Sequence, residues 1–134
     1  MKDKTPILDF ETCERIGINT EDAIFARTIQ KLNNLHPSKT RMSYYDSLAL
    51  DINQSEGLLS NGDTPAKTEV LNILREEYRN LDELERHCLF LYLGSSEMEE
   101  TEMINDLAWH FEEILMDRAD AFLSPTRVQN RLKN

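Results

Sequence analysis

The side chains that could carry chemistry begin with two pairs of an acid and a histidine at helical spacing. Glu83 lies four residues before His87, and Asp106 lies four residues before His110. A carboxylate and an imidazole one turn apart can bind a metal ion from one helix face. Helical bundles that hold two metals use inward-facing glutamates and a Glu-x-x-His spacing, which neither pair has. We therefore expect no metal site and no cofactor, and only surface hydrogen bonding at both pairs.

The two cysteines form no recognisable motif. Cys13 and Cys88 are far apart along the chain and belong to no CxxC or Cys/His spacing, so we expect neither a zinc site nor a disulfide framework. The first residues are charged, and the longest apolar run, at residues 88–93, is far too short to span a bilayer. These observations predict a reduced, cytoplasmic protein that is neither secreted by the usual signal nor inserted in a membrane.

Signatures of catalysis are missing from the sequence. We find no glycine-rich phosphate loop, no G-x-S-x-G and no Cys/His pair in a recognisable context. Cys13 could act as a nucleophile only if the fold placed a base beside it. We predict that the protein is not an enzyme.

Negative charge is concentrated in one segment, residues 96–123. It holds nine acidic residues against one basic residue, Arg118, in a chain of formal net charge −10. On a helix, with about 100° of rotation per residue, six of the acids fall within a sector of about 60°. This sector lies opposite an inward apolar stripe of Ile104, Leu107, Ala108, Phe111, Leu115, Ala119 and Phe122. This row of carboxylates, called the acidic face below, would span roughly 30 Å. It consists of Glu99, Glu102, Asp106, Glu113, Asp117 and Asp120.

The acidic face has two interpretations. It is either the solvated outer side of a helical bundle or a docking surface for a basic partner. Trp109 bears on the choice, because it falls at the edge of the acidic sector with Met116 beside it two turns later. An aromatic ring and a methionine ringed by charge are typical of a binding hot spot. Packing of Trp109 under a neighbouring helix is the alternative.

The first half of the chain shows helical periodicity in three segments. Residues 7–16 predict a short helix opened by Asp9 and closed by Gly17. A longer helix is expected from Asn19 or Thr20 up to the His36-Pro37 dipeptide, and another over residues 40–60.

Two longer segments follow. Thr64 and Pro65 predict the start of a helix that runs toward Leu93, with a kink or restart near Asn80, which could form a capping box with Glu83. Gly94 should end that helix. Ser96 and Glu99 then predict a second capping box after a connection of two or three residues, which would make the helices on either side antiparallel neighbours. Ser124-Pro125 should end the last helix.

These elements predict an all-α fold, a compact bundle of four main helices plus a short N-terminal helical segment. With 134 residues, 40% of them hydrophobic and 30% charged, the chain suits a single domain. We expect that domain to cover residues 1–134, with loose termini at 1–6 and 126–134. The second of these carries Arg127, Arg131 and Lys133, which could screen the acidic face.

The acidity favours a function in protein binding. A strongly negative surface repels nucleic-acid phosphates and anionic lipids, so we expect no direct nucleic-acid or membrane binding. We predict a small binding protein that neutralises a basic, nucleic-acid-handling protein, as immunity proteins, antitoxins and phage-encoded inhibitors do. The contacts would be the acidic face with Trp109 and Met116. The alternative is an assembly or regulatory subunit that forms a homodimer, or joins a complex, through an apolar helix face such as residues 88–93.

Overall fold

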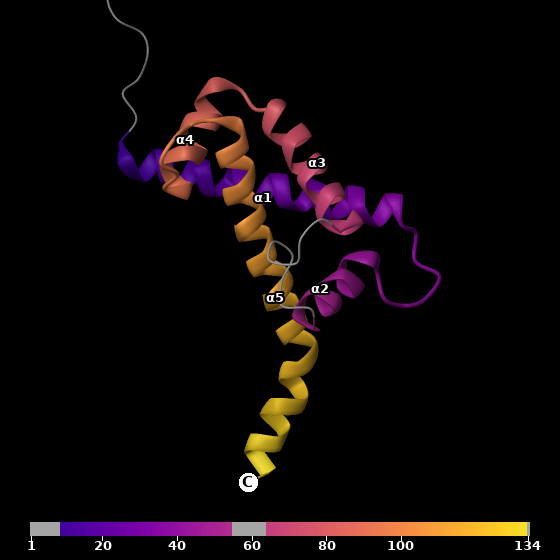
Figure 1. The fold of residues 1–134 in the computed structure, drawn as a ribbon. Helices are drawn as coiled ribbons and strands as arrows, with labels where there is room; N and C mark the ends of the chain where they lie inside the picture. Colours follow the sequence, from indigo (N-terminus) through magenta and orange to yellow (C-terminus); the bar gives the residue numbers. More distant parts are fainter. Residues whose placement is uncertain (1–8, 55–63, 134) are drawn as a thin grey trace, which may run out of the picture.

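Five α-helices account for most of the structure, a computed structural model (Figure 1). It describes the backbone of residues 9–54 and 64–133 and the side chains of residues 9–52 and 64–122. The helices are α1 (Phe10–Leu35), α2 (Tyr44–Gln54), α3 (Pro65–Arg79), α4 (Glu83–Leu93) and α5 (Glu100–Lys133). The described ranges contain no strand, which confirms the predicted all-α class. The predicted loose terminus at 1–6 lies outside the described residues.

The N-terminal helix is one continuous element, and the predicted break at Gly17 is wrong. Asp9 caps α1 as predicted, because its side chain accepts the Thr12 N–H at 2.7 Å. Gly17 lies inside α1 and faces α4, where an added Cβ would meet the Tyr92 Cβ at 2.6 Å and the Cys88 carbonyl oxygen at 2.7 Å. The glycine therefore serves close helix packing and not chain reversal. Neither Asn19 nor Thr20 caps a helix, since both lie within α1.

The second helix is shorter than predicted. It begins at Tyr44, not near residue 40, and the Ser43 hydroxyl oxygen accepts the Asp46 N–H at 3.2 Å in its first turn. Its described part ends at Gln54, and residues 55–63 lie outside the described part. The predicted start of the next helix is confirmed: the Thr64 hydroxyl oxygen accepts the Lys67 N–H at 3.1 Å.

The long third helix of the prediction is two helices. The break falls near Asn80, as the alternative allowed, but the capping box uses Asp82 and Glu85 instead of Asn80 and Glu83. Asn80 instead ends α3, where its N–H bonds to the last carbonyls of that helix. Leu81 lies between the two helices and is buried, so the break also delivers an apolar side chain to the core.

The connection from α4 to α5 is longer than predicted. Gly94 ends α4 in the left-handed region, at a φ of 71°, as the sequence indicated. α5 begins only at Glu100, so the predicted Ser96–Glu99 capping box is wrong. Ser96 lies too far before the first turn to cap it, and its N–H and hydroxyl bond to the Glu102 side chain instead.

The last helix continues past Ser124-Pro125, which the sequence predicted as its end. The backbone of α5 is helical as far as Lys133. A proline inside a helix removes one hydrogen bond, and no further proline or glycine follows within α5 to interrupt the helix. Whether residues 126–134 are loose stays a prediction, and the side chains of Arg127, Arg131 and Lys133 lie outside the described part.

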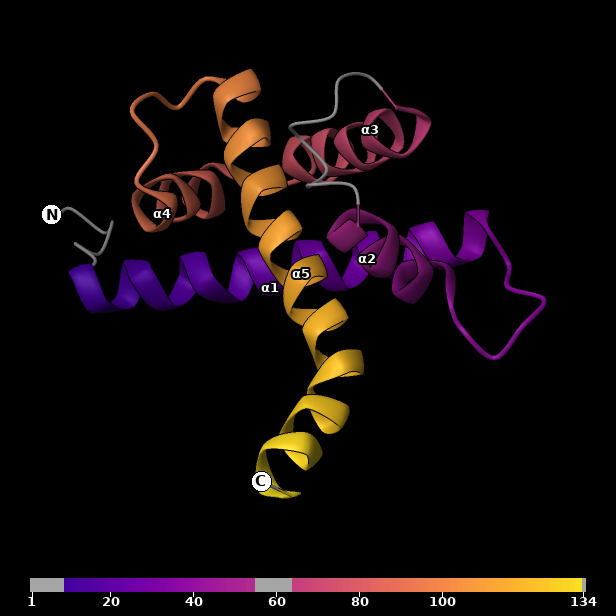
Figure 2. The ribbon, with the colours of Figure 1, turned by 60° about the horizontal axis from the view of Figure 1, so that its bottom comes forward.

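The arrangement is built on the crossing of α1 and α5. α1 packs on α4 along its first half and on α3 and α2 along its second, while α5 crosses α1 steeply and packs mainly on α2 and α3 (Figures 1 and 2). The predicted antiparallel pairing of α4 with α5 is therefore wrong, since these two helices touch only slightly. One buried apolar cluster joins the helices, with Ile24, Leu74 and Phe111 among its members. In the described ranges no helix has the length and apolar content needed to cross a membrane.

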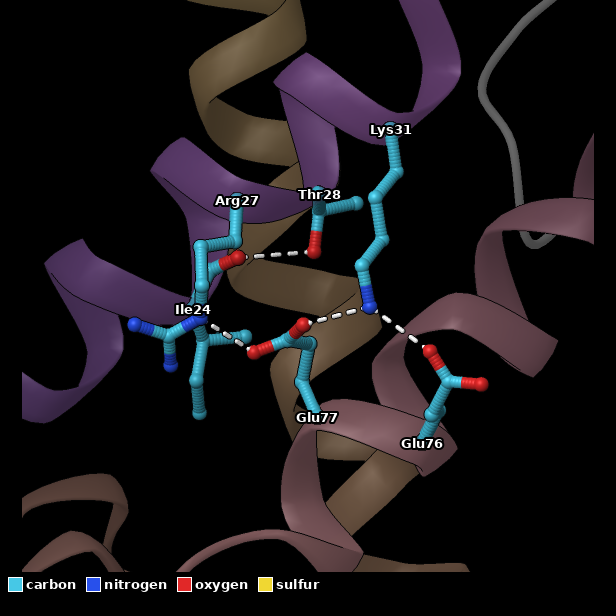
Figure 3. Close-up of polar contacts among 6 residues, drawn as sticks. All are labelled: Ile24, Arg27, Thr28, Lys31, Glu76 and Glu77. Atoms are coloured by element: carbon cyan, nitrogen blue, oxygen red, sulfur yellow. Dashed lines mark hydrogen bonds and ion pairs between the residues drawn. The ribbon is translucent and has the colours of Figure 1, made fainter. Parts of the chain in front are cut away.

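A polar contact fixes α3 against α1 beside this core. Glu77, with only 3% of its side chain exposed, accepts bonds from Arg27 at 2.5 Å and Lys31 at 2.7 Å, and Lys31 also reaches Glu76 at 2.6 Å (Figure 3). Burial alone would raise the pKa of the Glu77 carboxyl, but the bonds from Lys31 and Arg27 outweigh it and lower that pKa. Glu77 is therefore a buried carboxylate held in its charged form.

Candidate protein-binding surface

α5 is positioned by its apolar stripe, which fixes the direction of its other side. Among its side chains up to residue 122, seven are buried: Met103, Ile104, Leu107, Ala108, Phe111, Leu115 and Ala119. The sequence also predicted Phe122 in this stripe, but that ring is 39% exposed and lies 4.9 Å from the Arg118 guanidinium. Ala119 is the last buried side chain in the described part of α5, and the C-terminal part of this helix extends beyond the other helices (Figure 2).

Trp109 and Met116 lie on the outward side. The Trp109 side chain is 58% exposed and that of Met116 is 43% exposed. Packing of the tryptophan under a neighbouring helix, the alternative left open by the sequence, does not occur. Trp109 and Met116 thus present apolar surface to solvent two helical turns apart, on the helix that also carries the exposed carboxylates.

The carboxylates of the acidic face fall into two groups. Four of them are exposed: Glu99, Glu113, Asp117 and Asp120. Two are half-buried and hold the connection that precedes α5: Glu102 accepts hydrogen bonds from the Ser96 N–H and hydroxyl, and Asp106 accepts one from the Ser95 hydroxyl. The sequence did not reveal this role, because Ser96 and Ser95 bond to carboxylates six and eleven residues away, outside any local capping pattern.

The basic residues near α5 are engaged away from the acidic face. Arg118 pairs with Asp46 of α2 at 2.8 Å, and Arg79 of α3 pairs with Glu100 at 2.8 Å. Among the described residues, no lysine or arginine forms an ion pair with Glu99, Glu113 or Asp117. The negative charge of these three exposed carboxylates can therefore act on an approaching partner.

His110 takes part in a different contact from the one its spacing indicated. Its Nδ1 lies 2.6 Å from the Glu21 carboxylate of α1, and the Tyr92 ring of α4 lies edge-on to the His110 ring, with 6.2 Å between the ring centroids. Burial raises the pKa of the Glu21 carboxyl, and the hydrogen bond and charge of His110 offset only part of that rise. The Asp106 and His110 side chains thus face different partners.

Metal ligation finds no support in these positions. Glu83 and His87 lie exposed on α4 at a shallow hollow, beside Leu84 and Met98. Within residues 9–52 and 64–122, no group of three or more histidine, cysteine or acidic side chains is placed to hold a metal ion.

The chain was also compared with known proteins. No protein-family model, curated protein or solved structure matches it. The most distinctive side chains of the described surface are Trp109, Met116 and the exposed carboxylates of α5.

Proposed function

We propose that the protein binds and neutralises a basic protein partner through the outward side of α5. Trp109 and Met116 are the anchors, and the acidic face steers the partner and pairs with its cations. In this proposal the protein carries out no chemistry of its own and acts in the cytoplasm.

The exposure of Trp109 is the observation that supports this proposal most strongly. Burying a tryptophan on binding removes a large apolar area from water and gives its indole N–H a partner, which is why tryptophan is enriched in binding hot spots. Glu113, one turn after Trp109, is exposed, and Met116 lies one turn beyond it. An apolar centre with a charged rim is the usual anatomy of a protein interface.

Charge complementarity indicates the class of partner. The exposed carboxylates favour a surface rich in lysine and arginine, such as the phosphate-binding site of a nuclease or another nucleic-acid-handling protein. Covering such a site would block its access to nucleic acid. Immunity proteins, antitoxins and phage-encoded inhibitors act in this way, which is an analogy of type only.

Two modes of binding are distinguishable. In docking, Trp109 fills a pocket on the partner; in phosphate mimicry, the carboxylates alone occupy a nucleic-acid groove. We favour docking, because the side chain of Trp109 is 58% exposed at the edge of the acidic face and would have to be accommodated in any groove.

The test is a pull-down from an extract of the native host at low salt. The bait with Glu113→Lys and Asp117→Lys should lose the partners that the wild-type bait recovers. These two positions are chosen because Glu102 and Asp106 hold the α4–α5 connection. The matched control is Glu14→Lys with Glu83→Lys, which changes net charge equally at exposed acids of α1 and α4. Equal recovery by all three baits would refute the proposal.

The assembly alternative is tested separately by light scattering. Most of the apolar run at residues 88–93 is covered, since Cys88 and Leu89 are buried and only Leu91 is exposed. A stable dimer whose mass does not change with salt would favour the assembly alternative over the inhibitor proposal.

A further inference from the structure

The fold brings together the two cysteines that the sequence separates. Cys13 is on α1 and Cys88 on α4, with 6% and 0% of their surfaces exposed. The two thiols are near enough that Cys13 contributes to raising the pKa of the Cys88 thiol, after the larger effect of burial. Both are free thiols in the structure.

The backbone contact beside them explains this proximity. Gly17 follows Cys13 by one helical turn and therefore lies on the same face of α1. Because Gly17 has no Cβ, α1 can approach α4 closely at this point. A Cβ added at Gly17 would lie only 2.7 Å from the Cys88 carbonyl oxygen. A disulfide needs Cα atoms within roughly 7 Å of each other, and such a helix crossing is the kind of packing that provides that separation.

We propose that Cys13 and Cys88 are a redox-responsive pair, which a peroxide oxidises to a disulfide that joins α1 to α4. The thiolate of one cysteine attacks a peroxide oxygen and becomes a sulfenic acid, and the O–O bond breaks to release water. The sulfur of the second cysteine then attacks the sulfenic sulfur, the S–S bond forms and a second water leaves. The two thiols lose two protons and two electrons in total, and hydrogen peroxide is reduced to two waters.

The apolar surroundings make this reaction slow in the folded protein. Burial, with a smaller contribution from neighbouring Cys13, raises the pKa of the Cys88 thiol to about 11. The thiolate then amounts to roughly one molecule in ten thousand at pH 7. Its fraction rises tenfold with each pH unit, so the initial oxidation rate should increase steeply between pH 7 and pH 9. Attack on peroxide that begins at Cys88 is therefore slow at pH 7.

The disulfide would also change stability, because it closes a loop that contains α2 and α3. Constraining so long a loop in the unfolded chain should raise the melting temperature on the order of 10 °C.

The experiment treats the reduced full chain with hydrogen peroxide, alkylates the remaining thiols in denaturant and measures the intact mass. We expect a monomer that has lost two hydrogens and accepts no alkylating agent, a peptide linking Cys13 to Cys88, and a higher melting temperature reversed by a reductant. Cys13→Ser and Cys88→Ser, checked for folding by circular dichroism, should show no such gain. Two thiols that both remain alkylatable, sulfinic acids at both positions or only cross-linked dimers would overturn the proposal.

A second variant tests the geometry and not only the thiols. Gly17→Ala places a methyl group against Cys88 and Tyr92 and should push α1 away from α4, so the disulfide yield at a fixed peroxide exposure should fall several-fold. Asn19→Ala, an exposed position on the same helix, should keep the wild-type yield. An unchanged yield in folded Gly17→Ala would show that close packing at this crossing does not control the reaction.

Discussion

Trp109 is the residue whose environment most favours binding over structure. It contributes little to the core, since more than half of its side chain is exposed, so its removal should leave folding intact. Its role can therefore be separated from stability, which is not true of the buried aromatic residues.

The first prediction concerns this tryptophan. Trp109→Ala should weaken binding to the partner by about 2 kcal/mol or more, roughly 30-fold in Kd, measured by calorimetry with the purified partner. Leu84→Ala is the control, because Leu84 is an exposed apolar residue of α4, 48% exposed, outside the proposed surface. If Trp109→Ala bound as tightly as the control while salt abolished binding in both, phosphate mimicry would replace docking.

The pKa values of two buried carboxyl groups are shifted in opposite directions by their surroundings. Glu77 faces Arg27 and Lys31, which lower its pKa, whereas burial raises the pKa of Glu21 despite His110. The folded state therefore favours the charged form of Glu77 and the protonated form of Glu21.

The second prediction follows for stability at pH 7. Glu77→Gln should lower the free energy of unfolding by about 1–3 kcal/mol, since both cations lose their charged acceptor. Glu76→Gln removes a contact to the same Lys31 from a side chain that is 66% exposed, so it should cost less than about 1 kcal/mol. Urea denaturation compares the two. Equal losses would mean that the burial of Glu77 is irrelevant.

The third prediction concerns pH. A carboxyl with a raised folded pKa contributes stability below its unfolded value, near 4.5, and loses that contribution as pH rises through the folded value. Wild type should therefore gain stability relative to Glu21→Gln as pH falls from 7 toward 4.5. The pH dependence at Glu77 should have the opposite sign. The greater stability of wild type over Glu77→Gln should persist above pH 4.5 and be lost as pH falls through the lowered pKa of Glu77. Parallel pH profiles of the two variants in urea titrations would contradict this assignment.

At the level of elements, local sequence patterns predicted the helices better than the connections between them. Asp9, Thr64 and Gly94 mark helix ends in both sequence and structure, because each acts through a contact within a few residues. Gly17 looked like another helix end, but its role depends on α4, whose contact with α1 no local pattern could reveal. Near Asn80, the sequence fits a capping box of Asn80 with Glu83 and another of Asp82 with Glu85. The structure has the second, and Leu81, which precedes it, is buried in the core.

The fourth prediction tests the reason for Gly17. Alanine normally stabilises a helix interior relative to glycine by roughly 0.5–1 kcal/mol. Here the crowding against Tyr92 and Cys88 should reverse the sign and lower the free energy of unfolding by about 1–3 kcal/mol in Gly17→Ala. Thermal or urea unfolding measures the effect, and Asn19→Ala provides an exposed control on the same helix. A stabilised Gly17→Ala would mean that the two helices separate without cost.

At the scale of the whole molecule, the sequence predicted which sides of the helices face inward but not which helices meet. The buried stripe of α5 was predicted almost completely, since periodicity alone defines it. Its neighbours were not, because a short connection favoured α4, whereas the structure places α5 against α2 and α3. The exposure of Trp109 likewise depended on this arrangement and could be decided only by the fold.

The fifth prediction addresses the point where the helices converge. Phe111 is fully buried, and its ring centroid lies 5.3 Å from that of Phe25 and 6.2 Å from that of Tyr45. Phe111→Ala should therefore lower the free energy of unfolding by about 3–5 kcal/mol in urea titrations. Phe10→Ala, at a ring that is 67% exposed, should stay within about 0.5 kcal/mol of wild type. Similar losses in both would place the centre of the core elsewhere.

The position of α5 in the chain has a consequence for synthesis. Helices α1 to α4 leave the ribosome first, yet α2 and α3 pack on α5, and α5 supplies seven of the core side chains that the structure describes. Until α5 emerges, the apolar sides of α2 and α3 lack their cover, and a nascent chain that stalls before residue 100 would be a substrate for chaperones and proteases. Folding is therefore completed only after the segment that carries the acidic face has been made, so every folded molecule already displays that face.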